Sequence, residues 1–141
     1  MQRFWIVYSL GIDAHIFLLD EPSACLDVEQ RQIMTKVIKR FLIHNKKVGF
    51  IVDHDMAVAV SLGAEPNSKT IIMQTINTDD NNERKFKANF PTNFNSGINK
   101  FLRILDRTFH TQTNSKHNRP RINKFNSQKD KEQKAKGIYY E

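Results

Sequence analysis

Two neighbouring carboxylates, Asp20 and Glu21, stand directly after four apolar residues, Ile16 to Leu19. A short apolar run without alternation is typical of a strand buried on both faces of a parallel sheet, and Pro22 should end it. Open α/β sheets bind ligands at the carboxyl ends of such strands. There one carboxylate could hold Mg²⁺ and its neighbour could activate a water. A solvated acidic turn is the simpler alternative.

A second predicted strand brings a histidine to the same edge of the sheet. The residues from Val48 to Val52 are again short and mostly apolar, and His54 follows them closely. Because we expect a helix between the strands, from the cap at Asp27 to about His44, the unit should be a right-handed parallel crossover. His54 should then lie near Glu21 and could donate a hydrogen bond to a phosphate, although a lone histidine is more often an ordinary surface residue.

The helix between the strands has clear boundary signals. Asp27 can accept hydrogen bonds from backbone amides at its start, and Gln30 stands three residues on, as in a capping box. Its apolar positions recur at helical spacing and predict a buried face: Ile33, Met34, Val37, Ile38, Phe41 and Leu42. The other elements we expect are helices over 2–10, 56–63 and 96–109 and a strand over 70–73, with a loop over 74–95.

The net charge of +7 is confined to the last third of the 141 residues. Residues 91–141 hold 11 basic and 4 acidic residues, which leaves 11 of each for residues 1–90. Such a block is either a solvated tail or a surface that meets phosphate. The single cysteine, Cys25, cannot form an internal disulfide and fits a reducing, intracellular compartment. No apolar stretch is long enough for a membrane span, so we expect a cytoplasmic protein without a membrane partner.

The string IFLLDEPSACLD at residues 16–27 resembles the Walker B and D-loop segment of ATP-binding cassette ATPases. That resemblance implies an α/β fold. It corresponds to the C-terminal part of a cassette, with a P-loop NTPase-like parallel sheet and helices, followed here by a C-terminal helix and a basic hinge tail. The phosphate loop, whose amides and lysine cradle the phosphates, does not occur in the sequence, and neither does the glycine-rich signature that normally precedes Walker B. We therefore expect the chain to begin where that signature has just ended.

More specific segments resemble subfamily E of the cassette proteins, the ribosome-recycling ATPases also called RNase L inhibitors. The tail counts most, because ordinary cassettes lack it. The segments are DEPSACLDVEQR (20–31), VIKRFLIHNKK (37–47), DHD (53–55), INKFLRIL (98–105) and NRPRINKFNS (118–127). Three positions depart from the family's usual residues: Cys25 replaces a tyrosine, Asp53 a glutamate and Asn118 an aromatic residue.

The resemblance implies a role for each candidate residue. Asp20 matches the Walker B aspartate, which would hold Mg²⁺ through water, and Glu21 matches the catalytic glutamate. Asp27 matches the nucleotide-contacting D-loop aspartate, and His54 matches the catalytic switch histidine. Residues 1–90 would be the C-terminal half of a second nucleotide-binding domain, with Walker B, D-loop and H-switch, and residues 91–141 a hinge-like helix with a basic tail.

The implied cofactors and partners belong to a longer protein. ATP and Mg²⁺ would bind only with the missing half of the cassette, and the family's iron–sulfur clusters have no ligands in this chain. The partners would be the remainder of the cassette protein, the small ribosomal subunit, ribosomal RNA and release or initiation factors. The chain would support ATP-driven splitting of ribosomal subunits in termination and initiation.

Other functions are compatible with the sequence. The chain could be a non-catalytic basic module that contacts ribosome or RNA, or a non-functional remnant. It could equally be a truncated gene product, half of a split gene or a misannotated fragment. We expect residues 98–127 to be an interaction segment, because large apolar residues recur among the arginines, whereas a plain disordered tail buries nothing.

Overall fold

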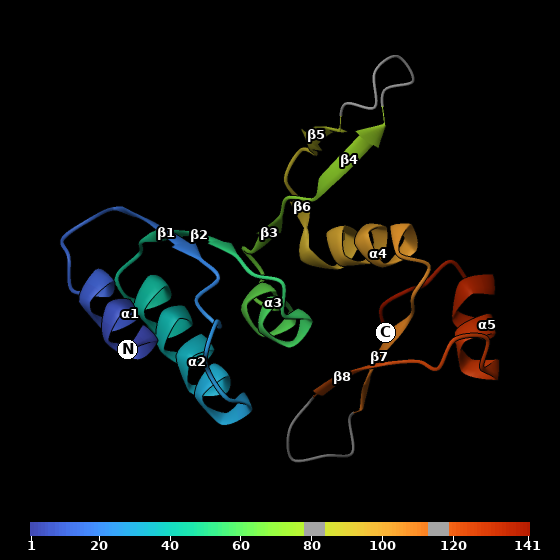
Figure 1. The fold of residues 1–141 in the computed structure, drawn as a ribbon, viewed down its shortest axis with the longest axis horizontal. Helices are drawn as coiled ribbons and strands as arrows, with labels where there is room; N and C mark the ends of the chain where they lie inside the picture. The colour runs from blue at the N-terminus through green and yellow to red at the C-terminus, as the bar shows by residue number, and fades with distance from the viewer. Residues whose placement is uncertain (78–83, 113–118) are drawn as a thin grey trace. The chain divides into compact units, whose positions relative to one another are not determined.

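The computed structural model describes residues 1–77, 84–112 and 119–141, and it divides into two compact units. The first unit is Met1–Leu62 and the second is Gly63–Glu141. Residues 78–83 of the expected loop over 74–95, and residues 113–118 of the expected interaction segment over 98–127, Asn118 among them, lie outside the described ranges. Figure 1 shows the order of the elements along the chain.

The first unit is built on one parallel strand pair. Its elements are α1 (Gln2–Leu10), β1 (Ile16–Asp20), α2 (Val28–His44), β2 (Val48–Val52) and α3 (Met56–Gly63), whose last residue belongs to the second unit. β1 and β2 run parallel, with Ile16 opposite Val48 and Asp20 opposite Val52. The expected strand–helix–strand unit is confirmed, and the bounds of these helices and strands agree with the expected ranges to within a residue.

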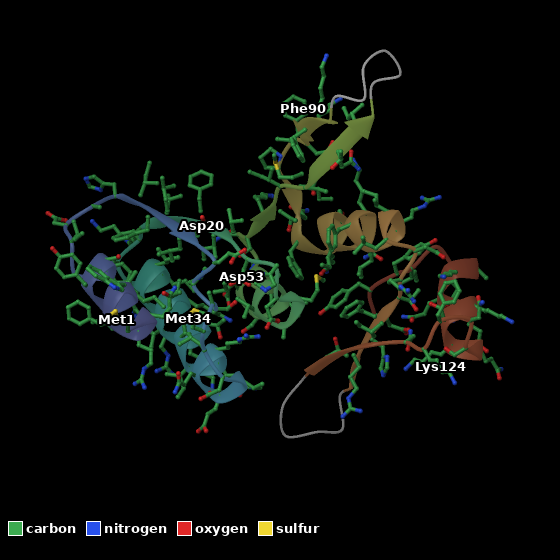
Figure 2. The ribbon with its side chains drawn as sticks, viewed as in Figure 1. Met1, Asp20, Met34, Asp53, Phe90 and Lys124 are labelled. Atoms are coloured by element: carbon green, nitrogen blue, oxygen red, sulfur yellow. The ribbon has the colours of Figure 1, made fainter. Side chains whose placement is uncertain are left out.

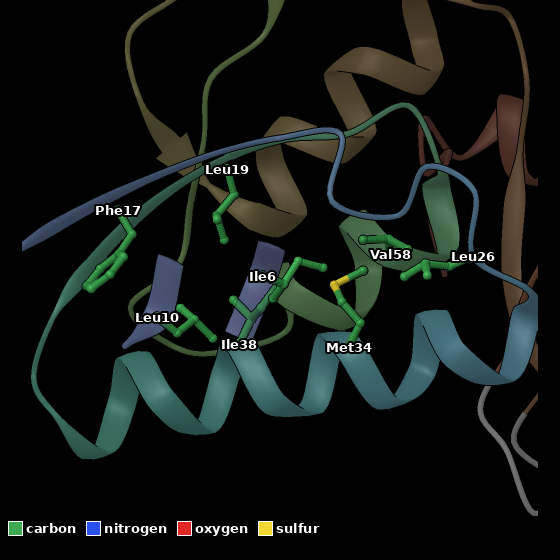
Figure 3. Close-up of a cluster of buried hydrophobic side chains, with 8 residues drawn as sticks. All are labelled: Ile6, Leu10, Phe17, Leu19, Leu26, Met34, Ile38 and Val58. Atoms are coloured by element: carbon green, nitrogen blue, oxygen red, sulfur yellow. The ribbon is translucent and has the colours of Figure 1, made fainter. Parts of the chain in front are cut away.

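The core of this unit lies between one face of the strand pair and the helices (Figure 3). Phe17 and Leu19 point from β1 toward α1 and α2, and Ile38 in the middle of α2 is fully buried. The ring of Phe17 meets that of Phe41 edge-on at 5.3 Å. The buried apolar cluster comprises Ile6, Leu10, Phe17, Leu19, Leu26, Met34, Ile38 and Val58.

The expected burial of the strands on both faces is wrong. Burial alternates along β1, so that Phe17 and Leu19 are buried while Leu18 is 78% exposed. The helices of this unit cover only one face of the pair, and the described residues of the unit leave the other face uncovered. That bare face carries Ile16, Leu18, Val48, Phe50 and Val52. In α2 the buried stripe is correspondingly narrower than expected, since Ile33 and Val37 are exposed.

The second unit consists of short antiparallel pairs and two helices. In chain order these are β3 (Lys69–Thr70), β4 (Met73–Asn77), β5 (Arg84–Ala88), β6 (Thr92–Asn93), α4 (Phe94–Ile104), β7 (Phe109–Gln112), β8 (Arg119–Ile122) and α5 (Gln128–Ala135). The pairs are β3 with β6, β4 with β5, and β7 with β8. The α/β class and the C-terminal helix are thereby confirmed.

Several expected boundaries in this unit are wrong. The expected strand over 70–73 is divided between β3 and β4, and the expected loop over 74–95 contains the β4–β5 pair. The sequence did not predict this strand pair because most of its side chains are polar, and the hydrogen bonds that join the strands are made by the backbone. The expected helix over 96–109 begins at Phe94 and ends at Ile104. Asp106 then takes a left-handed φ of +51°, which redirects the chain so that Phe109 enters β7.

The basic tail is held by buried polar side chains, which composition did not predict. The Thr108 hydroxyl donates to an Asp130 carboxylate oxygen at 2.5 Å and accepts from the Asn123 side-chain amide at 2.9 Å. The same amide also donates to Gln133, whose own amide donates to the backbone oxygen of Phe109 at 3.1 Å. All four of these side chains are buried. Because buried polar groups are stable only when they are paired, this network fixes α5 against β7 and β8.

The contacts in this network favour the charged forms of Asp130 and Lys134. The hydrogen bond from Thr108 is the main cause that lowers the pKa of Asp130 below its ordinary 3.8, with Lys134 and the Asn126 amide acting in the same direction against burial. The Lys134 ammonium lies 2.8 Å from Asp106 and 3.2 Å from Asp130. Asp106 chiefly, and Asp130 in addition, raise the pKa of Lys134.

We predict that Ile38→Ala destabilises the first unit by about 2–5 kcal/mol, because it removes a fully buried side chain and leaves a cavity. Ile33→Ala, in the same helix but 52% exposed, should change stability by less than about 0.5 kcal/mol. Denaturant unfolding followed by the fluorescence of Trp5, the single tryptophan, measures both values. Equal losses in the two variants would show that α2 packs by another face.

We predict that the second unit loses stability as the pH falls below about 4. Because the folded-state pKa of Asp130 is lowered, its contribution is complete above the unfolded value of 3.8 and is lost as the pH drops through the folded value. Hydrogen exchange of the Phe109 and Asn123 amides between pH 5 and 2.5 measures this. Asp130→Asn should remove most of the acid dependence, whereas Glu132→Gln, an exposed carboxylate on the same helix, should leave it intact. An unchanged acid transition in Asp130→Asn would contradict the assignment.

Candidate functional site

The strand pair brings two of the four candidate side chains into contact. The ladder continues one step beyond β1, because the Glu21 amide donates to the backbone oxygen of Val52 at 2.8 Å. The Nδ1 atom of His54 then lies 3.3 Å from the Oε1 atom of Glu21. Both side chains are largely exposed, at 71% for His54 and 54% for Glu21. The pair is therefore open to a ligand on the side away from the core.

Asp20 and Asp27 flank this pair without joining it. Asp20 is the last residue of β1 and its side chain is exposed; Figure 2 shows it and Asp53 near the adjoining ends of the two strands. Asp27 acts as the N-cap of α2 and accepts a hydrogen bond from the Gln30 amide at 2.8 Å, as its sequence context predicted. Among the described residues, no hydrogen bond or ion pair links Asp27 to Glu21 or His54.

The turn after β1 holds Glu21 in an uncommon backbone conformation. Its φ of +43° lies in the left-handed region, which costs a residue with a Cβ of order 1–3 kcal/mol and persists only where the surroundings impose it. Behind it, Pro22 and Ser23 are buried. The turn closes through the Ala24 amide, which donates to the Glu21 oxygen at 3.0 Å. Glu21 is thus presented by a constrained turn and not by a flexible loop.

Two aspartates beside His54 hold this turn and the helices. Both belong to the DHD motif (53–55), in which Asp53 stands in place of the family's usual glutamate, but the sequence assigned neither of them a role. Asp53 accepts from both the amide and the hydroxyl of Ser23, at 3.2 and 2.8 Å. Asp55 caps α3 by accepting from the Ala57 amide at 2.8 Å, and it forms an ion pair with Arg31 of α2. Their position on either side of His54 is a weak signal of such a role, because polar residues commonly follow a strand in any surface turn.

The side chains present fit Mg²⁺ only as part of a larger site. Within residues 1–77, 84–112 and 119–141 there is no group of three or more histidine, cysteine or acidic side chains able to hold a metal ion. Mg²⁺, however, is commonly held by one or two carboxylates, waters and substrate phosphates. The exposed carboxylate of Asp20 suits that arrangement if other groups bind the phosphates.

Comparison with known proteins identifies relatives over almost the whole chain. No family model matches it. It is 47% identical over 140 residues to the translation initiation factor RLI1 of Saccharomyces cerevisiae, covering 99% of this chain and 21% of the relative. It is 45% identical over 139 residues to the ABC transporter E family member 1 of Arabidopsis thaliana, with 99% and 21% covered. The chain thus spans about a fifth of the length of these relatives.

Solved structures give the same result. A structure described as RNase-L inhibitor aligns at a TM-score of 0.84 and 35% identity over 99% of this chain and 25% of its own. The archaeal ribosome recycling factor aABCE1, in complex with the stalk protein aP1, gives the same values. A ribosome-bound archaeal Pelota and ABCE1 gives a TM-score of 0.82 at 38% identity, over 99% and 22%.

These matches confirm the resemblance that the sequence motifs suggested, and they extend through the basic tail. None of the helices in the described part of the chain is long and apolar enough to cross a membrane. The matched region extends through both units, so it includes the strand-end site as well as the tail. Over 99% of its length the chain is similar to members of the E family of ATP-binding cassette proteins, and it spans about a fifth of the length of these relatives.

Proposed function

We propose that this chain supplies the Walker B, D-loop and switch-histidine part of an ATP-binding cassette that hydrolyses ATP in ribosome recycling. One observation carries the proposal. His54 and Glu21 approach to 3.3 Å at the carboxyl ends of two paired parallel strands, in a chain 47% identical to a translation initiation factor. Paired acid–base groups at such strand ends are where α/β folds perform chemistry on bound ligands.

Each candidate side chain has a role in this proposal. Glu21 accepts a proton from the attacking water, and its constrained turn directs the carboxylate away from the core. With Nδ1 of His54 facing Glu21, its Nε2 atom is left to face a phosphate oxygen, and it donates there, while Nδ1 donates to Glu21, when both ring nitrogens carry a hydrogen. Asp20 would hold Mg²⁺ through waters, and that ion would neutralise charge developing on the phosphates. Asp27 would contact the nucleotide from the start of α2.

The remainder of the cassette is the first partner that we propose. The strand pair exposes five apolar side chains on one face, whereas parallel sheets are normally covered on both faces. The sequence also has no phosphate loop with which to bind ATP by itself. A second segment that carried the phosphate loop and packed against this face would satisfy both needs at once.

The wider partners follow from what the relatives' descriptions say of those proteins. They name a translation initiation factor, a recycling factor with a ribosomal stalk protein, and a ribosome-bound complex with Pelota. We propose by analogy that the complete protein acts in the cytoplasm on the small subunit, its RNA, and release or initiation factors. The iron–sulfur clusters would belong to the rest of that protein.

A second candidate function is a basic module that binds ribosomal RNA without turnover. It is favoured by the charge of residues 91–141, with 11 basic against 4 acidic residues. The exposed side chains of Arg103 and Arg121 offer that charge on ordered elements. Leu102 and Phe109 are buried within the unit, whereas Ile122 and Phe125 remain exposed as possible contacts.

We predict that Glu21→Gln abolishes turnover but preserves ATP binding once a phosphate-loop segment, taken from the Saccharomyces cerevisiae relative, is supplied in trans. Loss of a general base costs roughly 10²–10⁴-fold in rate, and the amide keeps the shape of the side chain. Glu29→Gln, an exposed carboxylate in the first turn of α2, is the matched control and should hydrolyse ATP normally.

Two results would count against that assignment. Unchanged hydrolysis in Glu21→Gln would place the base elsewhere. Micromolar affinity of the 141-residue chain alone for ATP and Mg²⁺ would show that no second segment is needed. A mixture that never hydrolyses ATP, combined with tight binding of ribosomal RNA, would favour the non-catalytic module.

We predict that residues 91–141 bind ribosomal RNA through their positively charged side chains. Replacing Arg103 and Arg121 by glutamine should weaken binding to small subunits at low salt. It should also reduce the slope of log K against log salt by about 2, roughly one for each lost phosphate contact. Lys36→Gln with Arg40→Gln, an equal charge change on the exposed side of α2, is the control. Limited proteolysis should spare the described residues of 98–127. An unchanged salt slope, or rapid cleavage throughout, would contradict this role.

A further inference from the structure

We propose that Asp53 is a positioning residue, whose carboxylate sets the distance between Glu21 and His54. This inference rests on the proposed function for its purpose, since it concerns the same strand-end site. The geometry itself lies entirely within the first unit. The side chains that matter are Asp53, Ser23, Glu21 and His54.

The carboxylate of Asp53 joins the two chain segments that carry the pair. It accepts the Ser23 hydroxyl at 2.8 Å and the Ser23 amide at 3.2 Å, across 30 residues of sequence. It also accepts the amide of Asp55 at 2.8 Å. Hydrogen bonds to an ionised acceptor are stronger than neutral ones, and Ser23 is only 1% exposed. One side chain therefore fixes the residue two after Glu21 and the residue one after His54.

Glu21 and His54 need a contact of this kind because packing does not hold their side chains in place. Glu21 and His54 are 54% and 71% exposed, so few contacts restrict their rotamers. Glu21 also has the left-handed φ of +43°, which a turn adopts only when it is anchored on both sides. One anchor is the Glu21 amide bonded to Val52. The other anchor is Ser23 bonded to Asp53.

The neighbouring contacts make the anchor rigid on the side of His54. Asp55 caps α3 and pairs with Arg31, whose Nε atom also donates to the backbone oxygen of Leu26 at 2.9 Å. The segment 53–55 is thus tied to both helices and to the far end of the same turn. If Asp53 lost its carboxylate, these contacts would keep the fold while the Glu21 end of the turn could relax.

The test measures coupling between the two side chains by NMR of the full 141-residue chain. In the wild type, Glu21→Gln should shift the imidazole signals of His54, because the two side chains are in contact. In an Asp53→Ala background the same Glu21→Gln change should shift those signals by less than about half as much, as expected when a shared partner is lost. Ser23→Ala, which removes only the hydroxyl bond, should reduce the coupling by a smaller amount.

The controls separate positioning from general stability. Asp13→Ala removes an exposed carboxylate of the same unit and should leave the coupling unchanged. Circular dichroism verifies that each variant is folded; if Asp53→Ala does not fold, Ser23→Ala decides the question. Undiminished coupling in the folded Asp53→Ala variant, or in Ser23→Ala where Asp53→Ala does not fold, would overturn the proposal.

The readout requires no nucleotide, so it fails independently of the proposed function. Reduced coupling together with an inactive reconstituted cassette would support the positioning role and refute ATP hydrolysis. Undiminished coupling together with normal hydrolysis would refute the positioning role alone.

Discussion

The parallel pairing of β1 with β2 is the contact on which the candidate site depends. Glu21 and His54 are 33 residues apart in sequence, and they meet because the register sets Asp20 opposite Val52. The crossover through α2 makes this register possible, and the packing of Phe17, Leu19 and Ile38 between strands and helix maintains it. A change of one residue in register would turn the buried side chains outward and separate the pair.

The same strand pair also motivates the proposal that a second segment completes the site. A sheet of two strands has one face packed on α1 and α2, and the other bears large apolar side chains in contact with solvent. Its ends offer an acid, a histidine and a further carboxylate, and among the described residues of the first unit no side chains enclose a phosphate there. These features support the proposed function, in which this chain would position catalytic side chains while another segment binds the nucleotide.

The sequence predicted the first unit well because its signals are local. Asp27 as a helix cap, the periodicity of Met34 and Ile38, and the short apolar runs that form β1 and β2 each act over a few residues. What it missed are the long-range and polar features. The bond from Ser23 to Asp53 joins residues that no local pattern connects, and one-sided burial depends on which elements are available to cover a face.

The second unit shows the same limit more strongly. Asp130 and Gln133 look like solvated residues of a charged tail, yet both are buried in a network with Thr108. The end of α4 depends on the left-handed turn at Asp106. The sequence has no glycine at this position that would have predicted such a turn. Hydrophobic periodicity identified Ile98 and Leu102 correctly, but it continued the helix past that turn to Phe109.

The central claim is that the pairing of β1 with β2, together with the turn contacts that follow it, brings Glu21 to His54 before any nucleotide or second segment is present. Nuclear Overhauser contacts in the isolated, isotope-labelled chain test this most directly. The account predicts cross-strand contacts that place Leu18 beside Phe50, together with a contact between the side chain of Glu21 and the imidazole of His54. A chain that shows the cross-strand contacts but keeps these two side chains apart would contradict it.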